Sequence, residues 1–356
     1  MRSLIVDYQS IIKSEIFLLH RYANYIVRIH FRLVSGLING PIKTVNKSPA
    51  ADGTLMSMMD FRYWRCIMKR EWKCPDTEIN FFLYTPERPW KQWVDVRHKH
   101  LLDAYGWRSS RKNVLIVHGF NGTHSKTPMS NIRDAYLSRK DYNVFMVDWS
   151  PLTRFPCYLS SLSNMKLTAQ CAAQLYSYLT TAGAMAKMIT CVGHSLGAHI
   201  CGMISNHLSE KQYKIVGLDP ARPLVTNFGS KLFRLGRDDA HVVHILHTNA
   251  GFLGETGLVG HADFCINGGN MQPGCKGHFM RKSRCSHFQS SCYFAATVRR
   301  RIRMVGVPCD STCPKTRGRW GITLDRRAVR LGEETPDSSR GMYCVRLDHE
   351  EDCPFD

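Results

Sequence analysis

One five-residue pattern constrains this chain more than any other feature of its sequence. The segment Gly193-His194-Ser195-Leu196-Gly197 follows a short apolar run that ends at Val192, and residues 198–208 then carry apolar side chains at helical spacing. A strand, a tight turn and a helix are the context in which Gly-x-Ser-x-Gly presents a reactive serine. Because glycine has no Cβ, the two glycines let the strand and the helix approach closely. The pattern also occurs by chance, so the rest of the chain decides whether Ser195 is catalytic.

Apolar runs of strand length alternate with helical stretches along the middle of the chain. The runs are residues 79–84, 113–117, 143–147, 188–192, 214–218 and 241–246. Between them, residues 165–184 carry apolar side chains four apart and predict an amphipathic helix. This alternation predicts the α/β class, with a mostly parallel sheet covered by helices on both faces. Ligands bind beyond the carboxyl ends of such strands, so we expect Ser195 and the turns after its neighbouring strands to meet there.

A serine becomes nucleophilic only when a base accepts its proton and an acid orients that base. Asp219 directly follows the run 214–218, in a topology where the acid precedes the histidine along the chain. The alternative for Asp219 is a helix cap. His287, beside Cys285 and ahead of a helix predicted over 288–298, is the preferred base. Two rival histidines stay open, His261 and His278.

The oxyanion formed by attack on an ester needs two preorganised donors. One is expected to be the backbone N–H of Leu196, the residue after the serine. The other is expected from the glycine-rich turn 118–122, where we select the N–H of Phe120.

The positions of the cysteines and histidines indicate the cellular compartment of the protein and argue against a metal-binding site. Fourteen cysteines, an even number, indicate an oxidising compartment and disulfides. Their spacings do not repeat and contain no C-x-x-C pair, so no metal site is expected. Histidines at 241, 244 and 247 lie in a predicted strand, where residues three apart face opposite sides, so packing is the preferred interpretation. Three cysteines inside apolar elements are interpreted as buried free thiols, Cys171, Cys191 and Cys201.

The chain is strongly basic, with a net charge of +19. This favours anionic partners, such as a phospholipid membrane surface or an acidic polysaccharide. No nucleic-acid-binding motif accompanies the charge, so nucleic acid is not expected. The arginine-rich run 299–303 is the candidate anionic-surface patch.

The first sixty residues differ from the rest. They show no strand periodicity and are interpreted as an N-terminal extension or leader, with the catalytic domain over 61–356. Apolar runs near the start are interrupted by Arg21 and Arg28, so they do not form a clear signal peptide. The cysteine content still favours an extracellular protein.

Separate motifs stand in a fixed order along residues 74–298. They are Val117-His118-Gly119-Phe120, Val147-Asp148-Trp149, the serine pattern, Gly217-Leu218-Asp219-Pro220-Ala221, Gly260-His261-Ala262-Asp263-Phe264 and Cys285-Ser286-His287. In this order they resemble the pancreatic-lipase family of secreted α/β-hydrolases, and especially its insect lipase-like and phospholipase A1 branch. The resemblance implies one α/β-hydrolase catalytic domain without a C-terminal β-sandwich. It also implies Ser195, Asp219 and His287 as catalytic triad, Phe120 and Leu196 as oxyanion donors, and no cofactor; colipase is not expected.

The resemblance further implies a disulfide between Cys275 and Cys285 that closes a lid over the site. The lid segment comprises nine residues, Lys276, Gly277, His278, Phe279, Met280, Arg281, Lys282, Ser283 and Arg284. It is shorter than in triglyceride lipases of the family, and its basic side chains suit a charged headgroup. Cys265 with Cys292 is the second expected pair, because both flank the His287 region.

Together these features predict a secreted serine carboxylester hydrolase that releases fatty acid from lipid at a membrane or lipid interface. Phospholipase A1 activity on the sn-1 ester is preferred. Two alternatives stay open. One is a neutral triacylglycerol lipase or broad carboxylesterase, and the other is a non-catalytic lipid-binding or yolk-type storage relative.

Overall fold

The computed structural model describes residues 66–98, 100–301, 303–310, 312–314, 328–347 and 353. All of them belong to one compact unit, Trp64–Asp356. The extension predicted over residues 1–60 lies outside the described residues.

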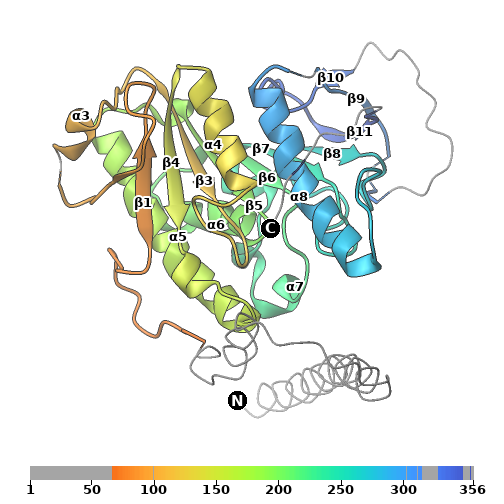
Figure 1. The fold of residues 1–356 in the computed structure, drawn as a ribbon, viewed down its shortest axis with the longest axis horizontal. Helices are drawn as coiled ribbons and strands as arrows, with labels where there is room; N and C mark the ends of the chain where they lie inside the picture. Colours follow the sequence, from red (N-terminus) through yellow and green to blue (C-terminus); the bar gives the residue numbers. More distant parts are fainter. Residues whose placement is uncertain are drawn as a thin grey trace, which may run out of the picture. The chain divides into compact units, whose positions relative to one another are not determined.

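The described strands form a single sheet in the order β10-β9-β11-β8-β7-β6-β5-β3-β4-β1-β2 (Figure 1). Their bounds are β1 Asn80–Tyr84, β2 Gln92–Trp93, β3 Lys112–Val117, β4 Tyr142–Asp148, β5 Ile189–His194, β6 Gln212–Leu218, β7 Ala240–His247, β8 Ala262–Ile266, β9 Val305–Pro308, β10 Val329–Arg330 and β11 Gly341–Val345. Pairing is parallel from β4 through β3, β5, β6, β7 and β8 to β11. The edge strands β1, β2, β9 and β10 pair antiparallel. The predicted α/β class with a mostly parallel sheet is confirmed.

Helices cover both faces of this sheet. Helices α4 (Met129–Ser138) and α8 (Phe279–Val298) contact each other over one face, and α5 (Tyr158–Thr181) and α6 (Leu196–Ile204) cover the other (Figure 1). Two one-turn segments complete the described α-helices, α3 (Leu101–Ala104) and α7 (Val225–Phe228). Within the described part of the chain, no helix combines the length and apolarity needed to cross a membrane.

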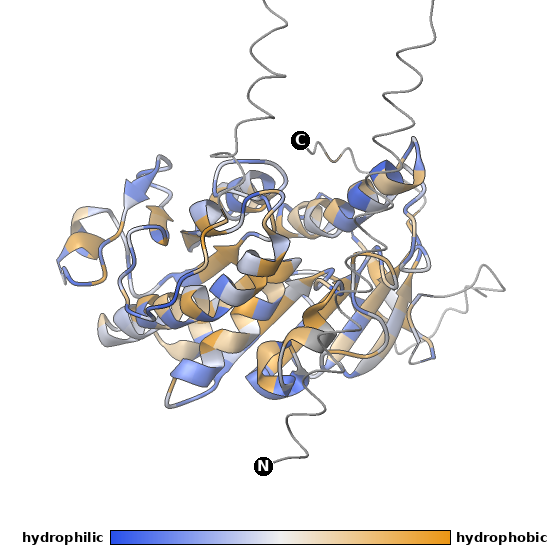
Figure 2. Cartoon of the chain, turned by 90° about the horizontal axis from the view of Figure 1, so that it is seen from below, coloured by the Kyte–Doolittle hydropathy of each residue, from blue (hydrophilic) through white to orange (hydrophobic). Residues whose placement is uncertain are grey.

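The central strands are apolar on both faces because each face carries a helix layer. In β3, Leu115 and Val117 pack in the core with α5 and α6, whereas Val114 and Ile116 pack with α4 and α8. Neighbouring residues of a strand point to opposite faces, so a continuous apolar run is what such a strand requires. The strands are accordingly among the most hydrophobic segments of the ribbon (Figure 2).

The sheet extends further than the sequence pattern predicted. Strand β8 and the strands after α8 were not expected, and β11 pairs in parallel with β8, with Cys344 opposite Cys265. Each is short and interrupted by polar residues or cysteine, so neither shows the long β-branched run that identified β3 to β7. The chain beyond residue 298 therefore adds strands β9, β10 and β11 to the sheet.

All fourteen cysteines are paired. The disulfides are Cys66–Cys157, Cys74–Cys171, Cys191–Cys201, Cys265–Cys313, Cys275–Cys285, Cys292–Cys353 and Cys309–Cys344. The interpretation of Cys171, Cys191 and Cys201 as free thiols is wrong, because each faces a second cysteine from a neighbouring element.

The pairing of Cys265 with Cys292 is also wrong. Phe264 packs with residues of α8, so the next residue of β8, Cys265, points to the opposite face of the sheet. There it meets Cys313, while Cys292 on α8 bonds to Cys353.

Candidate active site

Ser195 occupies a strained turn between β5 and α6. Its φ of 57° and ψ of −122° lie outside the regions that non-glycine residues prefer. Its N–H donates to the carbonyl of Leu218 at 3.1 Å, which fixes the turn against the end of β6. A Cβ on Gly193 would lie 2.3 Å from the carbonyl oxygen of Gly197, so the two elements approach as closely as the pattern predicted.

The 118–122 loop after β3 packs directly against this turn. A Cβ on Gly119 would lie 2.6 Å from the Cβ of Ser195, so only glycine lets the loop come this close. The N–H of Asn121 donates to Thr153 and that of Gly122 to Gly119. By contrast, the N–H groups of Phe120 and Leu196 donate to no acceptor within the described residues. The loop and the start of α6 thus hold two uncommitted donors beside the serine.

A buried carboxylate at the end of β4 fixes this loop in place. Asp148 contacts Nε2 of His118 at 3.1 Å and Nδ1 of His124 at 2.6 Å. Nδ1 of His118 lies 3.0 Å from the carbonyl of Gly119, and Trp149 donates through its indole to the carbonyl of His118. Burial alone would raise the pKa of Asp148. The hydrogen bonds from both histidines outweigh burial and hold this pKa below its usual range. In the sequence, Asp148 stands out only as part of the motif Val147-Asp148-Trp149, and nothing there indicates its role.

Asp219 is fully buried and accepts three hydrogen bonds. Oδ1 accepts from the backbone N–H groups of Thr248 and Asn249 at 2.9 and 3.0 Å, and Oδ2 accepts from Nδ1 of His287 at 2.6 Å. A Cβ on Gly254 would lie 2.5 Å from Oδ1, so the β7–β8 loop closes tightly over the carboxylate. The carboxylate faces the histidine rather than a helix terminus, which excludes the capping alternative.

His287 lies inside α8 rather than ahead of a helix. The helix begins at Phe279, so the helix predicted over 288–298 starts nine residues too late. The two rival histidines are elsewhere. Nδ1 of His261 accepts from the N–H of Val243, and His278 is exposed at the first residue before α8. Among these candidates, only His287 contacts Asp219.

His194 connects the serine turn to His287, a role that was not predicted from the sequence. Its Nε2 donates to the backbone carbonyl of His287 at 3.1 Å, and the two rings are 4.6 Å apart. Burial lowers the pKa of His194 well below its usual range, so this ring is neutral. As the variable residue of the serine pattern, it gave no local signal of this contact.

A second missed residue links the lid segment to Asp219. The Asn249 backbone donates to Asp219, and its side-chain Oδ1 accepts from the hydroxyl of Ser283 at 2.7 Å. The position of the helix start is therefore tied to the loop that holds the carboxylate.

The histidines of β7 pack as the strand interpretation predicted. His241 is exposed, whereas His244 and His247 are buried. Nε2 of His247 contacts Oδ2 of Asp263 at 2.8 Å, and Asp263 also accepts from the N–H groups of residues 259 and 260. Burial alone would lower the pKa of His247, but the hydrogen bond to Asp263 outweighs burial and raises this pKa. The described residues bring together no three side chains able to hold a metal ion.

The lid segment is mostly helix. Cys275 and Cys285 are joined, and only residues 276–278 are loop, because α8 begins at Phe279. The side chains of this segment are exposed, except that of Ser283. The ring of Phe279 packs edge-on against Phe252 of the β7–β8 loop, with centroids 5.1 Å apart.

Exposed apolar side chains stand on the loops and helix ends that follow the parallel strands, on the edge that carries Ser195. They are Phe155 and Leu159 after β4, Leu224 and Phe228 after β6, Phe252 after β7, and Phe279 and Met280 at the start of α8. We call this set the apolar rim. Hydrogen bonds join the loops, from Tyr158 to the carbonyl of Pro223 and from Arg222 to that of Gly251. Exposed apolar groups gathered at one edge mark a surface for an apolar ligand or a lipid interface.

A parallel sheet with helices on both faces and a serine in a strained strand-to-helix turn define an α/β-hydrolase. Within that class, the lipase family model matches residues 54–317, and the chain belongs to this family. The resemblance inferred from the motifs is confirmed.

Individual relatives are similar over most of the catalytic unit. Lipase member H-B of Xenopus laevis is 33% identical over 238 residues, which are 66% of this chain and 51% of that protein. Phospholipase A1 of Vespula squamosa is 31% identical over 251 residues, 66% of this chain and 83% of that protein. Pancreatic lipase-related protein 2 of Mus musculus is 26% identical over 306 residues, 78% of this chain and 63% of that protein. The chain thus spans about half the length of the lipase member H it matches.

Proposed function

We propose that this chain is a secreted serine carboxylester hydrolase of lipids, with residues 61–356 as its catalytic domain. In this proposal Ser195 is the nucleophile, His287 the base and Asp219 the acid that orients the base. The observation that carries it is the 2.6 Å contact between Nδ1 of His287 and Asp219, made beside the strained serine turn. A buried carboxylate, a histidine and a serine at a strand end are the parts that acyl transfer requires.

The geometry supports a two-step acyl transfer. Because Nδ1 of His287 gives its proton to the bond with Asp219, Nε2 is left free to accept the proton of Ser195. Ser195 then attacks the ester carbonyl, and the N–H groups of Phe120 and Leu196 stabilise the oxyanion. Each such donor lowers the barrier by roughly 3–4 kcal/mol. His287 protonates the departing alcohol, and water, deprotonated by the same ring, releases the fatty acid from the acyl-enzyme.

Phospholipid is the preferred substrate, with cleavage at the sn-1 ester. The acyl chain would meet the apolar rim, while exposed Lys276, Arg281 and Lys282 of the lid segment would face the headgroup phosphate. Cationic side chains beside a partly desolvated mouth favour a charged headgroup over a neutral oil. Similarity to a protein named phospholipase A1 also supports this choice.

An extracellular location agrees with the cysteine chemistry. Seven disulfides join all fourteen cysteines, and such bonds persist in oxidising compartments.

A substrate comparison tests the proposal. The purified chain is given sn-1-labelled phosphatidylcholine or phosphatidylserine beside triolein, and fatty acid release is measured. We expect phospholipid cleavage, with a loss of several orders of magnitude in Ser195→Ala because the nucleophile is removed. Ser209→Ala, an exposed serine in a loop, serves as the matched control and should retain full activity.

Each other outcome points to a different function. Preference for triolein would replace the phospholipid assignment with neutral lipase activity. No cleavage of either lipid by a folded chain would favour a lipid-binding role without catalysis.

A further inference from the structure

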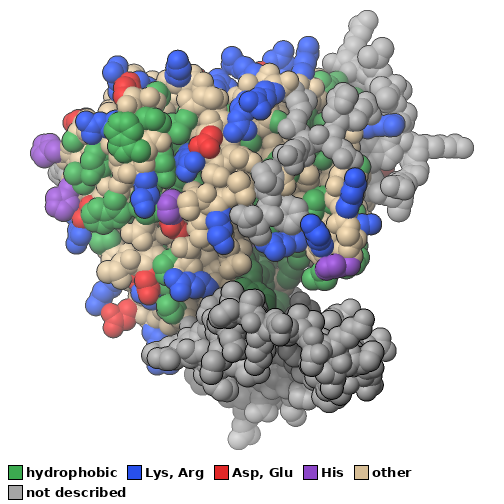
Figure 3. Space-filling model, viewed as in Figure 1, with side chains coloured by type: hydrophobic (Ala, Val, Ile, Leu, Met, Phe, Trp, Pro, Cys, Tyr) green, Lys and Arg blue, Asp and Glu red, His purple; other side chains and the backbone are tan. Residues whose placement is uncertain are grey.

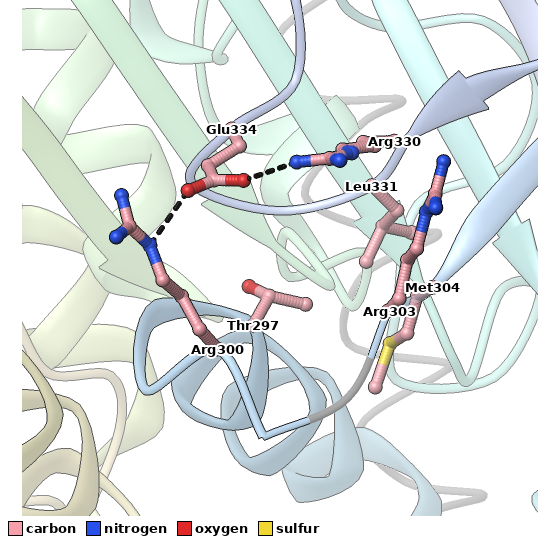
Figure 4. A pocket seen from close by; sticks show the side chains of 7 residues that line it. All are labelled: Thr297, Arg300, Arg303, Met304, Arg330, Leu331 and Glu334. Atoms are coloured by element: carbon pink, nitrogen blue, oxygen red, sulfur yellow. Dashed lines mark hydrogen bonds and ion pairs between the residues drawn. The ribbon is translucent and has the colours of Figure 1, made fainter.

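A pocket of about 420 Å³ lies at the far end of α8, away from the lid segment. It is lined by Thr297, Arg300, Arg303, Met304, Arg330, Leu331 and Glu334 (Figure 4). Thr297 is ten residues beyond His287 on the same helix, a separation of about 15 Å along the axis. This pocket is therefore separate from the proposed catalytic centre.

Charge in the pocket is unbalanced. Glu334 lies between two arginines, with Nε of Arg300 and Nη1 of Arg330 each 2.7 Å from one of its carboxylate oxygens. In Figure 4 dashed lines mark both contacts, from Nε of Arg300 and from one terminal nitrogen of Arg330 to Glu334. Arg303 reaches no carboxylate among the residues that the structure describes. Three guanidinium groups face one carboxylate, which leaves a charge of +2.

The guanidinium groups keep donors for a ligand. Arg300 uses only its Nε–H and Arg330 only one Nη toward Glu334, so each retains N–H groups on its remaining nitrogens. Planar guanidinium groups bind phosphate oxygens in bidentate pairs, which is why arginine predominates in phosphate recognition.

The floor of the pocket is apolar and firmly built. Met304 and Leu331 are 2% and 3% exposed, and the N–H of Leu331 donates to the carbonyl of Met304 at 3.0 Å. A Cβ on Gly332 would lie 2.0 Å from Oγ1 of Thr297, so the loop carrying Glu334 packs tightly on the end of α8. The volume falls in the range of small-molecule sites, about 300–1,000 Å³, and exceeds what a phosphate group alone would fill.

We propose that this pocket binds a phosphate monoester, with Arg300, Arg303 and Arg330 holding the phosphate and Met304 and Leu331 contacting the carbon skeleton attached to it. A phosphate monoester carries a charge of −1.5 to −2 at neutral pH, which matches the excess charge of the pocket. Glu334 acts as the internal counterion that keeps two of the arginines in place before the ligand arrives. The phosphate can come from a soluble ester or from the headgroup of a lipid such as phosphatidate, and binding at this site requires no ester hydrolysis.

Comparison of Glu334→Gln with a glutamate variant elsewhere that changes the net charge equally distinguishes this site from general attraction to a basic surface. We measure binding of glycerol 3-phosphate to the full chain by calorimetry at low salt. All variants carry Ser195→Ala as well, so that no lipid is hydrolysed when vesicles are used. Arg303→Ala and Arg330→Ala should each weaken binding about tenfold, because a charged donor is lost. Glu334→Gln should tighten binding several-fold, because it removes the competing negative charge while keeping a hydrogen-bond acceptor.

A second glutamate bridged by two arginines provides the matched control. Glu87 contacts Arg108 and Arg111, far along the chain from α8. Arg108→Ala and Glu87→Gln change the net charge by the same amounts as the pocket variants and should leave binding unchanged.

Vesicles identify the source of the phosphate. Phosphatidylcholine vesicles containing phosphatidate are compared with vesicles brought to the same surface charge by phosphatidylserine, which has no monoester. Binding of glycerol 3-phosphate with no preference for phosphatidate assigns the site to a soluble ester, and preference for phosphatidate that is lost in Arg303→Ala assigns it to a lipid headgroup. The proposal is overturned if neither probe saturates at one site per chain, if Arg108→Ala weakens binding as much as Arg303→Ala, or if a sulfated polysaccharide binds where both phosphate probes fail.

Discussion

At the scale of single residues, the buried Asp148 and the partly buried Asp239 have pKa values shifted in opposite directions. Asp148 receives hydrogen bonds from two histidines and one backbone N–H, which lower its pKa despite burial. Asp239 receives one, from the N–H of Gly236, and burial raises its pKa to about 6. Hydrogen bonds compensate the charge of Asp148 for its burial. The charge of Asp239 is not fully compensated, so its ionisation at neutral pH destabilises the fold.

Asp239→Asn should therefore remove a pH-dependent loss of stability. The folded pKa of about 6 exceeds the ordinary aspartate pKa of 3.8, so the native state binds this proton more tightly than the unfolded state. Protonated Asp239 favours the folded state, and this contribution to stability is fully present below pH 3.8. It is lost as pH rises from 3.8 to about 6, which costs about 2–3 kcal/mol at pH 7.5. Asparagine keeps an oxygen for Gly236 and carries no charge. In urea unfolding, the variant should exceed the wild type by roughly 2 kcal/mol at pH 7.5, and the two should converge near pH 3.5.

The exposed loop serine Ser209 provides the comparison. Ser209→Ala removes no titratable group, so its effect on stability should be the same at both pH values. A stability difference for Asp239→Asn that is the same at both pH values would contradict the assignment to this carboxylate.

At the scale of elements, α8 connects three features of the molecule. Its 20 residues span about 30 Å, with the lid segment at one end, His287 in the middle and the arginine pocket at the other end. The Cys275–Cys285 disulfide and the contact between Ser283 and Asn249 fix the exposed end. The same helix therefore carries the proposed base and the side chains that would meet a headgroup.

In the proposed function, Ser283→Ala should lower kcat by more than its small loss of folding stability accounts for. The variant loses the hydrogen bond to Asn249, which contributes about 1 kcal/mol to stability, and frees the residue whose N–H holds Asp219. We expect kcat on phospholipid to fall several-fold with little change in KM. Ser291→Ala is the control, because this serine is buried in the same helix and its hydroxyl has no partner among the described residues. Equal kcat values for the two variants would show that the contact does not reach the carboxylate.

Elements were predictable where the evidence is local. The serine turn, Asp219 and the strands β3 to β7 follow from short patterns, because each is determined by neighbouring residues. The contact of His194 with His287 joins residues 93 apart, and β8 becomes recognisable as a strand only beside β11. Disulfides that span 48 to 97 residues, such as Cys265–Cys313 and Cys74–Cys171, are likewise set by how the sheet and helices pack. The start of α8 was not recognised because residues 281, 282 and 284 are basic and exposed to solvent. A helix segment of this kind lacks the regular spacing of apolar side chains that identifies a helix in sequence.

At the scale of the whole molecule, positive charge is distributed unevenly. Residues 299–330 contain ten basic and two acidic residues, a net charge of +8 out of +19 for the chain. On the face seen in Figure 3, lysine and arginine clearly outnumber aspartate and glutamate. The apolar rim lies at the edge of the sheet that carries Ser195. In the proposed function, positive charge and exposed apolar side chains would make two separate contributions to binding an anionic lipid surface.

These two contributions should separate in vesicle binding. Attraction between surface charges is screened within about 8 Å at 0.15 M salt, whereas burial of apolar side chains is not screened. Adsorption of the full chain to vesicles containing phosphatidylserine should therefore weaken steeply as salt rises through about 0.15 M. Phe279→Ala, which removes an exposed ring of the rim, should weaken adsorption by a similar factor at low and high salt, on neutral phosphatidylcholine as well. Adsorption to anionic vesicles that does not change with salt would exclude the electrostatic contribution, and an effect of Phe279→Ala confined to anionic vesicles would exclude the apolar one.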